Sequence, residues 1–147
     1  MRNALTSAVA LLSLTLCAAA PAAAGDPAGK WLTQNGKAKI GIARCGDALC
    51  GTIVALQEPI DPDTGKPRTD VNNPDAALSG RPLIGVVIVF DMKPNGTPDA
   101  WDGKVYNAED GKTYTGSLTL TGADTLELKG CALLGLICKG QTWTRTK

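Results

Sequence analysis

Histidine is absent from the chain, although the chain has 147 residues. This absence excludes serine or cysteine nucleophiles that a histidine activates, histidine acid–base catalysis and histidine-rich metal sites. An enzyme would have to use carboxylates, and the spacing of the available ones does not predict a pair at working distance. Acidic residues among Pro, Gly and Asn usually form turns, and these acids are Glu58, Asp61, Asp63, Asp70 and Asp75. The sequence therefore favours no enzymatic activity and no cofactor.

Aromatic residues are also scarce, with three Trp, two Tyr and one Phe. Ligand cavities are lined mainly by hydrophobic and aromatic side chains, so this composition argues against a spacious lipid pocket. Metal sites have little support too. Asp61-x-Asp63-x-Gly65 begins like a calcium loop, but Asn72 stands where the loop needs its bidentate glutamate. We therefore predict no metal.

The first 24 residues have the pattern of a Sec-type signal peptide. Arg2 supplies the positive start, residues 9–16 supply the apolar stretch, and Ala22-Ala23-Ala24 supplies an A-x-A cleavage site. We therefore expect cleavage after Ala24, a periplasmic or secreted location, and a single domain over residues 25–147.

Neither a long hydrophobic run nor a block of like charges points to a membrane or a nucleic acid. Pro21 breaks the leader too early for a membrane-spanning helix. Leu16 precedes Cys17, where a lipid-modification signal needs a small residue. Because Arg2 leaves with the leader, 14 of the 15 basic residues remain against 14 acidic ones. This balance predicts no nucleic-acid partner and no stable membrane anchor, and it leaves the oligomeric state open.

Four cysteines remain after the leader, at positions 45, 50, 131 and 138. An even number in an exported chain indicates two disulfides. Each pair lies close in sequence around turn residues, and opposed strand residues lie within disulfide distance. The bonds Cys45–Cys50 and Cys131–Cys138 are therefore favoured over crossed pairing. The spacings C-x4-C and C-x6-C do not match structural zinc sites, and the chain has no C-x-x-C redox motif.

Strand patterns separated by turn residues cover the rest of the chain, and no stretch keeps a helical period. Leu126 and Leu128 alternate with polar residues, which is typical of a sheet with one dry face. "LIGVVIVF" (83–90) is apolar on both faces, which indicates either cover by a loop or the N-terminus, or a dimer contact. Eight strands in mostly short hairpins predict a sandwich or a closed barrel; they cover residues 30–34, 37–44, 51–57, 83–90, 101–106, 113–121, 125–129 and 142–146.

The two ends of this strand series resemble the calycin pattern of lipocalins and their relatives. Gly29-Lys30-Trp31 opens the first strand, and Trp143-Thr144-Arg145 lies in the last. In calycins a G-x-W tryptophan at the barrel floor is covered by an arginine from the final strand, and a guanidinium stacked on an indole closes that end. The resemblance implies that Trp31 and Arg145 form a structural floor.

Most of the mature chain also resembles the DUF2147 family of exported bacterial proteins. The matching stretches are "GKWLTQNGKAKI", "CGDALCGTIVAL", "TGKPRTDVNNPD", "RPLIG", "KVYNAEDGKTYTGSLTL" and "CKGQTWTR". The two resemblances imply an all-β fold, an antiparallel up-and-down eight-stranded calycin-like barrel. The family lends no activity and no catalytic residues.

Alternate turns of such a barrel share its open rim. Gly36, the loop 58–81, "NAEDG" (107–111) and the apolar loop 131–138 would meet there. The apolar loop would then face the mouth or lie under the long loop, or else fill the barrel as a small core; its large side chains are Leu133, Leu134, Leu136 and Ile137.

Polar and aromatic residues near this rim have two interpretations each. Arg81 and Asn73 either brace the long loop, with Arg81 pairing Asp70 or Asp75, or contact a ligand. Trp101 and Tyr106 differ in parity along one strand, so only one of them faces the lumen unless a bulge intervenes.

We predict a small exported binding module that holds a small amphipathic ligand at the barrel mouth. Its candidate ligand contacts are Asn73, Arg81, Trp101, Tyr106, Leu133 and Leu134. The alternative is a protein-binding scaffold, such as an inhibitor acting in the cell envelope, that presents loop 58–81; an enzyme ranks third. A cavity below about 300 Å³ would favour the scaffold, because ligand pockets are usually larger.

Overall fold

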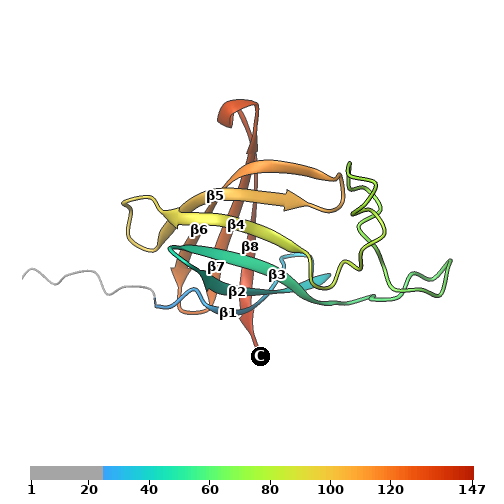
Figure 1. Cartoon of the computed structure of the whole chain (residues 1–147). Helices are drawn as coiled ribbons and strands as arrows, with labels where there is room; N and C mark the ends of the chain where they lie inside the picture. Colours follow the sequence, from blue (N-terminus) through green and yellow to red (C-terminus); the bar gives the residue numbers. More distant parts are fainter. Residues whose placement is uncertain (1–24) are drawn as a thin grey trace, which may run out of the picture.

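The computed structural model describes residues 25–147, which form eight antiparallel strands in a closed barrel (Figure 1). Neighbours in the barrel follow chain order, and the first strand closes on the last. The predicted all-β, up-and-down barrel is confirmed. The predicted signal peptide lies outside the described residues. The strands are β1 (Gly29–Leu32), β2 (Ala38–Cys45), β3 (Ala48–Leu56), β4 (Val87–Pro94), β5 (Ala100–Asn107), β6 (Lys112–Gly122), β7 (Thr125–Ala132) and β8 (Ile137–Thr146), with a 3-10 turn η1 (Leu133–Gly135) before β8.

Alternating side chains fill the interior of this barrel. Leu118 and Leu120 on β6 lie opposite Leu128 and Leu126 on β7, and all four are buried. Their neighbours along each strand point to the outer face, because side chains alternate along a strand. The same core includes buried residues from β1 to β5 and from β8, among them Trp31, Ile40, Ile42, Val89, Met92 and Trp143.

β4 begins later than the apolar run "LIGVVIVF" predicts. Gly85 has φ +100°, a left-handed conformation that favours glycine, so the extended strand begins at Val87. Val89 is fully buried, whereas Phe90 and Val87 border a shallow pocket whose other wall includes Arg81 from the preceding loop. The loop therefore covers part of the outer face of β4, as one of the two interpretations of this apolar run predicts.

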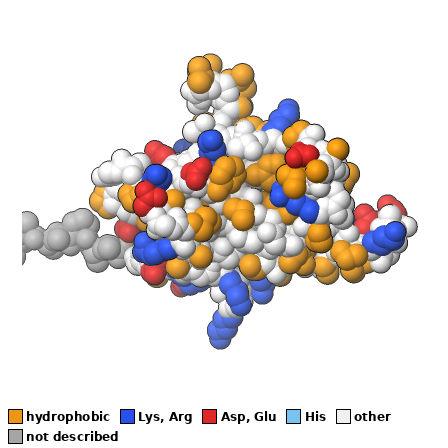
Figure 2. All heavy atoms as spheres, viewed as in Figure 1, with side chains coloured by type: hydrophobic (Ala, Val, Ile, Leu, Met, Phe, Trp, Pro, Cys, Tyr) orange, Lys and Arg blue, Asp and Glu red, His pale blue; other side chains and the backbone are white. Residues whose placement is uncertain are grey.

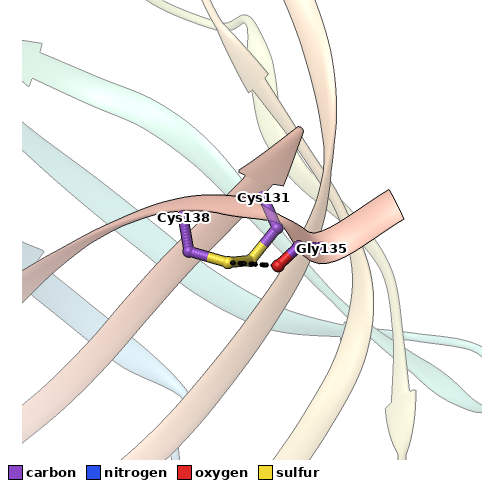
Figure 3. Close-up of a disulfide and its surroundings, with 3 residues drawn as sticks. All are labelled: Cys131, Gly135 and Cys138. Carbon is purple, nitrogen blue, oxygen red and sulfur yellow. Dashed lines mark hydrogen bonds between the residues drawn. A yellow bond between two sulfur atoms is a disulfide. The ribbon is translucent and has the colours of Figure 1, made fainter. Parts of the chain in front are cut away.

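Both strands of the β7–β8 hairpin extend further toward the turn than predicted. Pairing continues through Cys131 opposite Cys138 to Ala132 opposite Ile137. The disulfide Cys131–Cys138 joins the two strands beside the turn, where the Cys138 sulfur lies 3.5 Å from the Gly135 carbonyl oxygen (Figure 3). The other disulfide, Cys45–Cys50, spans the β2–β3 turn.

Peptide mapping under non-reducing conditions should recover Cys45 linked to Cys50 and Cys131 linked to Cys138. The turn between β2 and β3 and the turn between β7 and β8 belong to opposite ends of an up-and-down barrel, so their cysteines lie out of disulfide reach of each other. A peptide linking Cys45 to Cys131 would contradict this arrangement.

Candidate functional site

A cavity of about 470 Å³ opens at the end of the barrel where β1 turns into β2 and β5 into β6. Buried side chains form its apolar base, among them Ile40, Ile53, Val105, Leu128 and Trp143. Polar and charged side chains surround the opening: Thr33, Asn35, Lys37, Gln57, Glu58, Arg68, Asn107, Glu109 and Gln141. The cavity thus has an apolar base and a polar rim.

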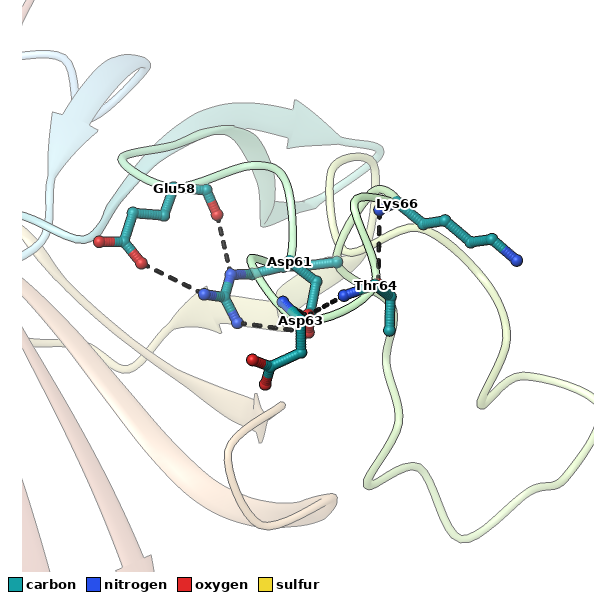
Figure 4. Close-up of polar contacts among 6 residues, drawn as sticks. Glu58, Asp61, Asp63, Thr64 and Lys66 are labelled. Carbon is teal, nitrogen blue, oxygen red and sulfur yellow. Dashed lines mark hydrogen bonds and ion pairs between the residues drawn. The ribbon is translucent and has the colours of Figure 1, made fainter.

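Hydrogen bonds fix several of these rim groups. The Trp143 indole N–H donates to Gln141 Oε1 at 2.8 Å, which orients the amide at the opening. The Arg68 guanidinium donates to the backbone oxygen of Glu58 at 2.9 Å and to its carboxylate at 3.2 Å, and it lies 3.9 Å from Asp61 (Figure 4). The Lys37 ammonium, in contrast, has no ion-pair partner within residues 25–147. Lys37 is therefore the rim cation that is available to a ligand.

A fully buried carboxylate, Asp70, lies in the loop between β3 and β4, residues 57–86, which we call the mouth loop. The Tyr106 hydroxyl donates to Asp70 Oδ1 at 2.6 Å, and Asn73 donates to Oδ2 at 2.8 Å. Arg81 donates to Oδ2 from Nε at 3.0 Å and from Nη2 at 2.7 Å. Every polar atom of this buried group is therefore satisfied, as burial requires.

The pKa values of this cluster keep Asp70 ionised and Tyr106 neutral. Burial opposes ionisation of Asp70, but the hydrogen bonds from Tyr106, Asn73 and Arg81 and the Arg81 charge together hold its pKa below the ordinary value. Burial, the hydrogen bond to Asp70 and the Asp70 charge raise the pKa of Tyr106. Asp70 is thus a stable anion that holds the mouth loop to β5 and is not suited to be a general base.

The mouth loop is also attached to the β5–β6 turn. The Asn72 side-chain amide donates to the backbone oxygens of Ala108 at 3.2 Å and Glu109 at 3.0 Å. Gly111 has φ +69°, and a Cβ there would overlap the Asn72 carbonyl oxygen. The contact of Asn72 with the β5–β6 turn could not be identified from the sequence, because the Asn, Asp and Gly residues of both segments indicate turns but not which turns meet.

The structure brings three of the predicted ligand contacts together. Asn73, Arg81 and Tyr106 meet at Asp70 and border a shallow pocket of about 240 Å³ on the outer face of β4 and β5. Arg81 pairs with Asp70, which is the contact expected if Arg81 braces the long loop. Tyr106 is the member of this group that also lies among the residues lining the mouth cavity.

Trp101 lies apart from this group. It pairs with Leu118 at the opposite end of β5 and packs half-buried against the core. The β5–β6 register is unbroken from Ala100 to Asn107, so Trp101 and Tyr106 point to opposite faces of the sheet. Trp101 borders neither pocket.

The prediction that Leu133 and Leu134 face the mouth or fill the barrel is wrong. Their side chains are 66% and 107% exposed, and those of Leu136 and Ile137 are also exposed. The reason is the extended pairing of β7 with β8, which carries the turn beyond the barrel wall, so the hairpin projects from the body of the molecule (Figures 1 and 2).

Trp31 and Arg145 meet at the end of the barrel opposite the cavity. The Arg145 guanidinium carbon lies 4.2 Å from the centre of the Trp31 ring, and Trp31 is fully buried. Arg145 donates to the backbone oxygens of Asp26 at 2.8 Å, Ala28 at 3.0 Å and Ala123 at 2.8 Å. The Trp31 indole donates to the Pro27 oxygen at 2.9 Å. This is the stacked geometry that the calycin resemblance implies.

Metal-binding groups do not gather in the part of the chain that the structure describes: no three His, Cys, Asp or Glu side chains are placed to share a metal ion. Asp61 Oδ1 instead accepts the backbone N–H groups of Asp63 at 2.9 Å and Thr64 at 3.2 Å, a turn that Figure 4 shows. Over residues 25–147, no helix has the length and hydrophobicity to cross a bilayer. The two disulfides fit an extracytoplasmic protein.

Comparisons with known proteins agree with this architecture. Residues 29–145 match the family described as "Uncharacterized protein conserved in bacteria (DUF2147)". Among solved structures, protein HP1028 from Helicobacter pylori, which is described as belonging to the lipocalin family, is 26% identical and superposes with a TM-score of 0.68, covering 83% of this chain and 84% of its own. No curated protein matches the chain. The chain therefore belongs to the DUF2147 family of bacterial proteins, and its barrel is lipocalin-like.

Proposed function

We propose that this protein is an exported binding module that holds a small amphipathic molecule in its mouth cavity. The observation that carries the proposal is the cavity itself, about 470 Å³ with an apolar base and a polar rim. Small-molecule sites usually measure about 300–1,000 Å³ and combine apolar walls with a few placed polar groups. The likeness to a protein of the lipocalin family supports the same proposal.

The lining indicates how such a ligand would lie. Its apolar part would pack on Ile40, Ile53 and Trp143, while its polar head would meet Gln141 and Lys37 at the rim. The volume suits a compact molecule, which agrees with the scarcity of aromatic side chains. In this proposal the signal peptide is removed after Ala24, residues 25–147 act as one domain in the periplasm or outside the cell, and no catalytic step takes place.

The substitution Ala38→Phe should lower ligand affinity at least tenfold while the barrel stays folded. Ala38 borders the cavity near the rim, and a phenyl ring there would occupy the space that the ligand's apolar part needs. Ala43→Phe is the matched control, because Ala43 lies exposed on the same strand and outside the cavity. Isothermal titration or tryptophan fluorescence checks the prediction; equal affinity in both variants would contradict it.

The ligand can be identified by native mass spectrometry of the protein purified from its own host. We expect a co-purifying small molecule on the wild-type protein and on Ala43→Phe, and its loss from Ala38→Phe. If all three proteins carry no small molecule, and none binds in a screen of amphipathic compounds, the cavity is not a ligand site.

The protein-binding scaffold is the second candidate, and one observation favours it. The mouth loop is held firmly by Asp70 and Asn72, yet it exposes apolar side chains, with Val71 70% exposed and Ile60 48% exposed. A rigid loop that presents apolar side chains suits binding to another protein. Under this alternative Ala38→Phe would leave partner binding unchanged, whereas Val71→Asn would weaken it.

A further inference from the structure

The projecting end of the β7–β8 hairpin exposes a cluster of large hydrophobic side chains. We define the hairpin tip as residues 133–137, whose four large aliphatic side chains are all exposed. Figure 2 shows hydrophobic side chains gathered at the end of this projection. Single exposed aliphatic residues are ordinary, but a cluster of this kind marks an interaction site.

The backbone conformation at the tip is unfavourable for its first two leucines. Leu133 and Leu134 have φ values of 49° and 55°, in the left-handed region that is costly for side chains other than those of Gly, Asn and Asp. The next residue, Gly135, supplies the conformational freedom that a tight turn needs. Two leucines thus occupy strained positions, and they gain no buried contact in return.

The tip satisfies part of its own hydrogen bonding. Leu136 N–H donates to the Leu133 oxygen at 3.2 Å, Ala132 pairs with Ile137, and the disulfide Cys131–Cys138 holds the two strands together directly below. This matters because an exposed backbone polar group is costly to bring into an apolar phase. A closed, cross-linked turn can enter the boundary of such a phase with few unpaired groups.

Two lysines, Lys129 and Lys139, flank the hairpin tip along the chain. Glu127 is the last acidic side chain of the sequence, so every charged side chain of residues 128–147 is basic. Lys129 lies opposite Gly140 and Lys139 opposite Gly130, so the two lysines point to opposite faces of the hairpin. Both are exposed, and neither has an ion-pair partner among residues 25–147. The mature chain has no net charge, so its overall composition does not reveal this local excess of basic residues.

The small area of the hairpin tip argues against a second copy of the chain as its binding partner. A stable protein interface buries about 800 Å² on each partner, and four aliphatic side chains at the end of one hairpin offer much less. A lipid surface has no such requirement, because apolar side chains need only reach the boundary between headgroups and acyl chains while basic residues contact anionic headgroups.

We propose that the hairpin tip inserts into the surface of an anionic lipid bilayer, with Lys129 and Lys139 against the headgroups. This gives a reversible, peripheral attachment and not a membrane anchor. It is independent of the cavity: the barrel would attach whether or not a ligand occupies the mouth.

Sedimentation with vesicles tests this proposal. The wild-type protein, with its disulfides intact, is mixed with vesicles of phosphatidylglycerol and phosphatidylethanolamine, or of phosphatidylcholine alone. We expect binding to the anionic vesicles that weakens as salt is raised and at least tenfold weaker binding to phosphatidylcholine. Leu133→Asn/Leu134→Asn should lower binding to anionic vesicles at least tenfold without lowering the melting temperature, since asparagine tolerates the left-handed conformation.

Matched controls distinguish binding through the hairpin tip from non-specific adsorption to vesicles. Val71→Asn removes an exposed aliphatic side chain elsewhere and should bind vesicles like the wild type. Lys129→Glu/Lys139→Glu should abolish the preference for anionic vesicles, whereas Lys104→Glu, an exposed lysine on β5, should have little effect. If the wild type stays in the supernatant with every lipid, or if the asparagine variant binds equally well, the proposal is overturned. It is also overturned if analytical ultracentrifugation shows a wild-type dimer that the asparagine variant dissociates, because the occupant is then a second copy.

Discussion

Replacing Asp70 by alanine should lower the free energy of unfolding by about 3 kcal/mol, because three donors lose their buried acceptor at once. Tyr106, Asn73 and Arg81 all donate to this carboxylate, and it is fully buried. For a domain of this size the loss corresponds to a drop of roughly 10 °C in melting temperature, measured by calorimetry or circular dichroism. Limited proteolysis should also cut the mouth loop of the variant much faster.

Asp63→Ala is the control for this prediction, because Asp63 lies exposed in the same loop and no ion pair or hydrogen bond of the described residues uses its carboxylate. Its melting temperature should stay within about 1–2 °C of the wild type, as for most surface substitutions. A similar result for Asp70→Ala would show that the cluster does not hold the loop.

The same carboxylate gives a pH dependence whose sign can be worked out. The pKa of Asp70 is lowered in the folded protein, so the folded state binds this proton less readily than the unfolded chain. The stabilisation from Asp70 is therefore complete above its unfolded pKa of about 3.9 and is lost as pH falls through the lower folded value. In Asp70→Asn the stability deficit should be constant from pH 5 to pH 8 and should shrink below pH 4.

Replacing Arg145 by alanine should lower the melting temperature by several degrees and leave ligand affinity unchanged. The substitution removes the stack on Trp31, worth on the order of 1–2 kcal/mol, and three hydrogen bonds to backbone oxygens. Arg145→Lys should recover little, because an ammonium cannot stack or reach three carbonyls as the planar guanidinium does. Thermal melts and ligand titrations measure both effects.

Arg44→Ala is the matched control, since Arg44 is largely exposed and its ion pair with Asp26 is long, at 3.7 Å. Exposed pairs of this kind contribute little. If Arg145→Ala melts like Arg44→Ala, the contact between Trp31 and Arg145 does not stabilise the barrel.

The strands could be predicted wherever inward and outward residues differ in polarity. Leu118, Leu120, Leu126 and Leu128 show the alternation plainly, and they lie in the strands where it places them. The hairpin end could not be predicted in this way, because residues 130–140 carry glycines and cysteines and no alternation. Pairing there follows from the register that the neighbouring residues and the disulfide impose.

The mouth could be located from the alternation of turns, but its chemistry could not be predicted. Five carboxylates lie in or beside the long loop, and the sequence does not distinguish buried Asp70 from exposed Asp63. The difference arises from Tyr106, which lies 36 residues away along the chain and reaches Asp70 only in the folded barrel. Strand parity separates Trp101 from Tyr106, but it does not say which side of the sheet becomes the lumen.

The closure of the barrel depends on β1, which has four residues, whereas every other strand has at least eight. β1 pairs on one side with β2 and on the other with β8. If β1 detached, two unpaired strand edges would open at once, and such edges pair readily with strands of other molecules. Arg145 binds the carbonyls of Asp26 and Ala28, in the segment that leads into β1. We therefore expect Arg145, by holding this segment, to keep β1 paired and so to limit edge-to-edge aggregation.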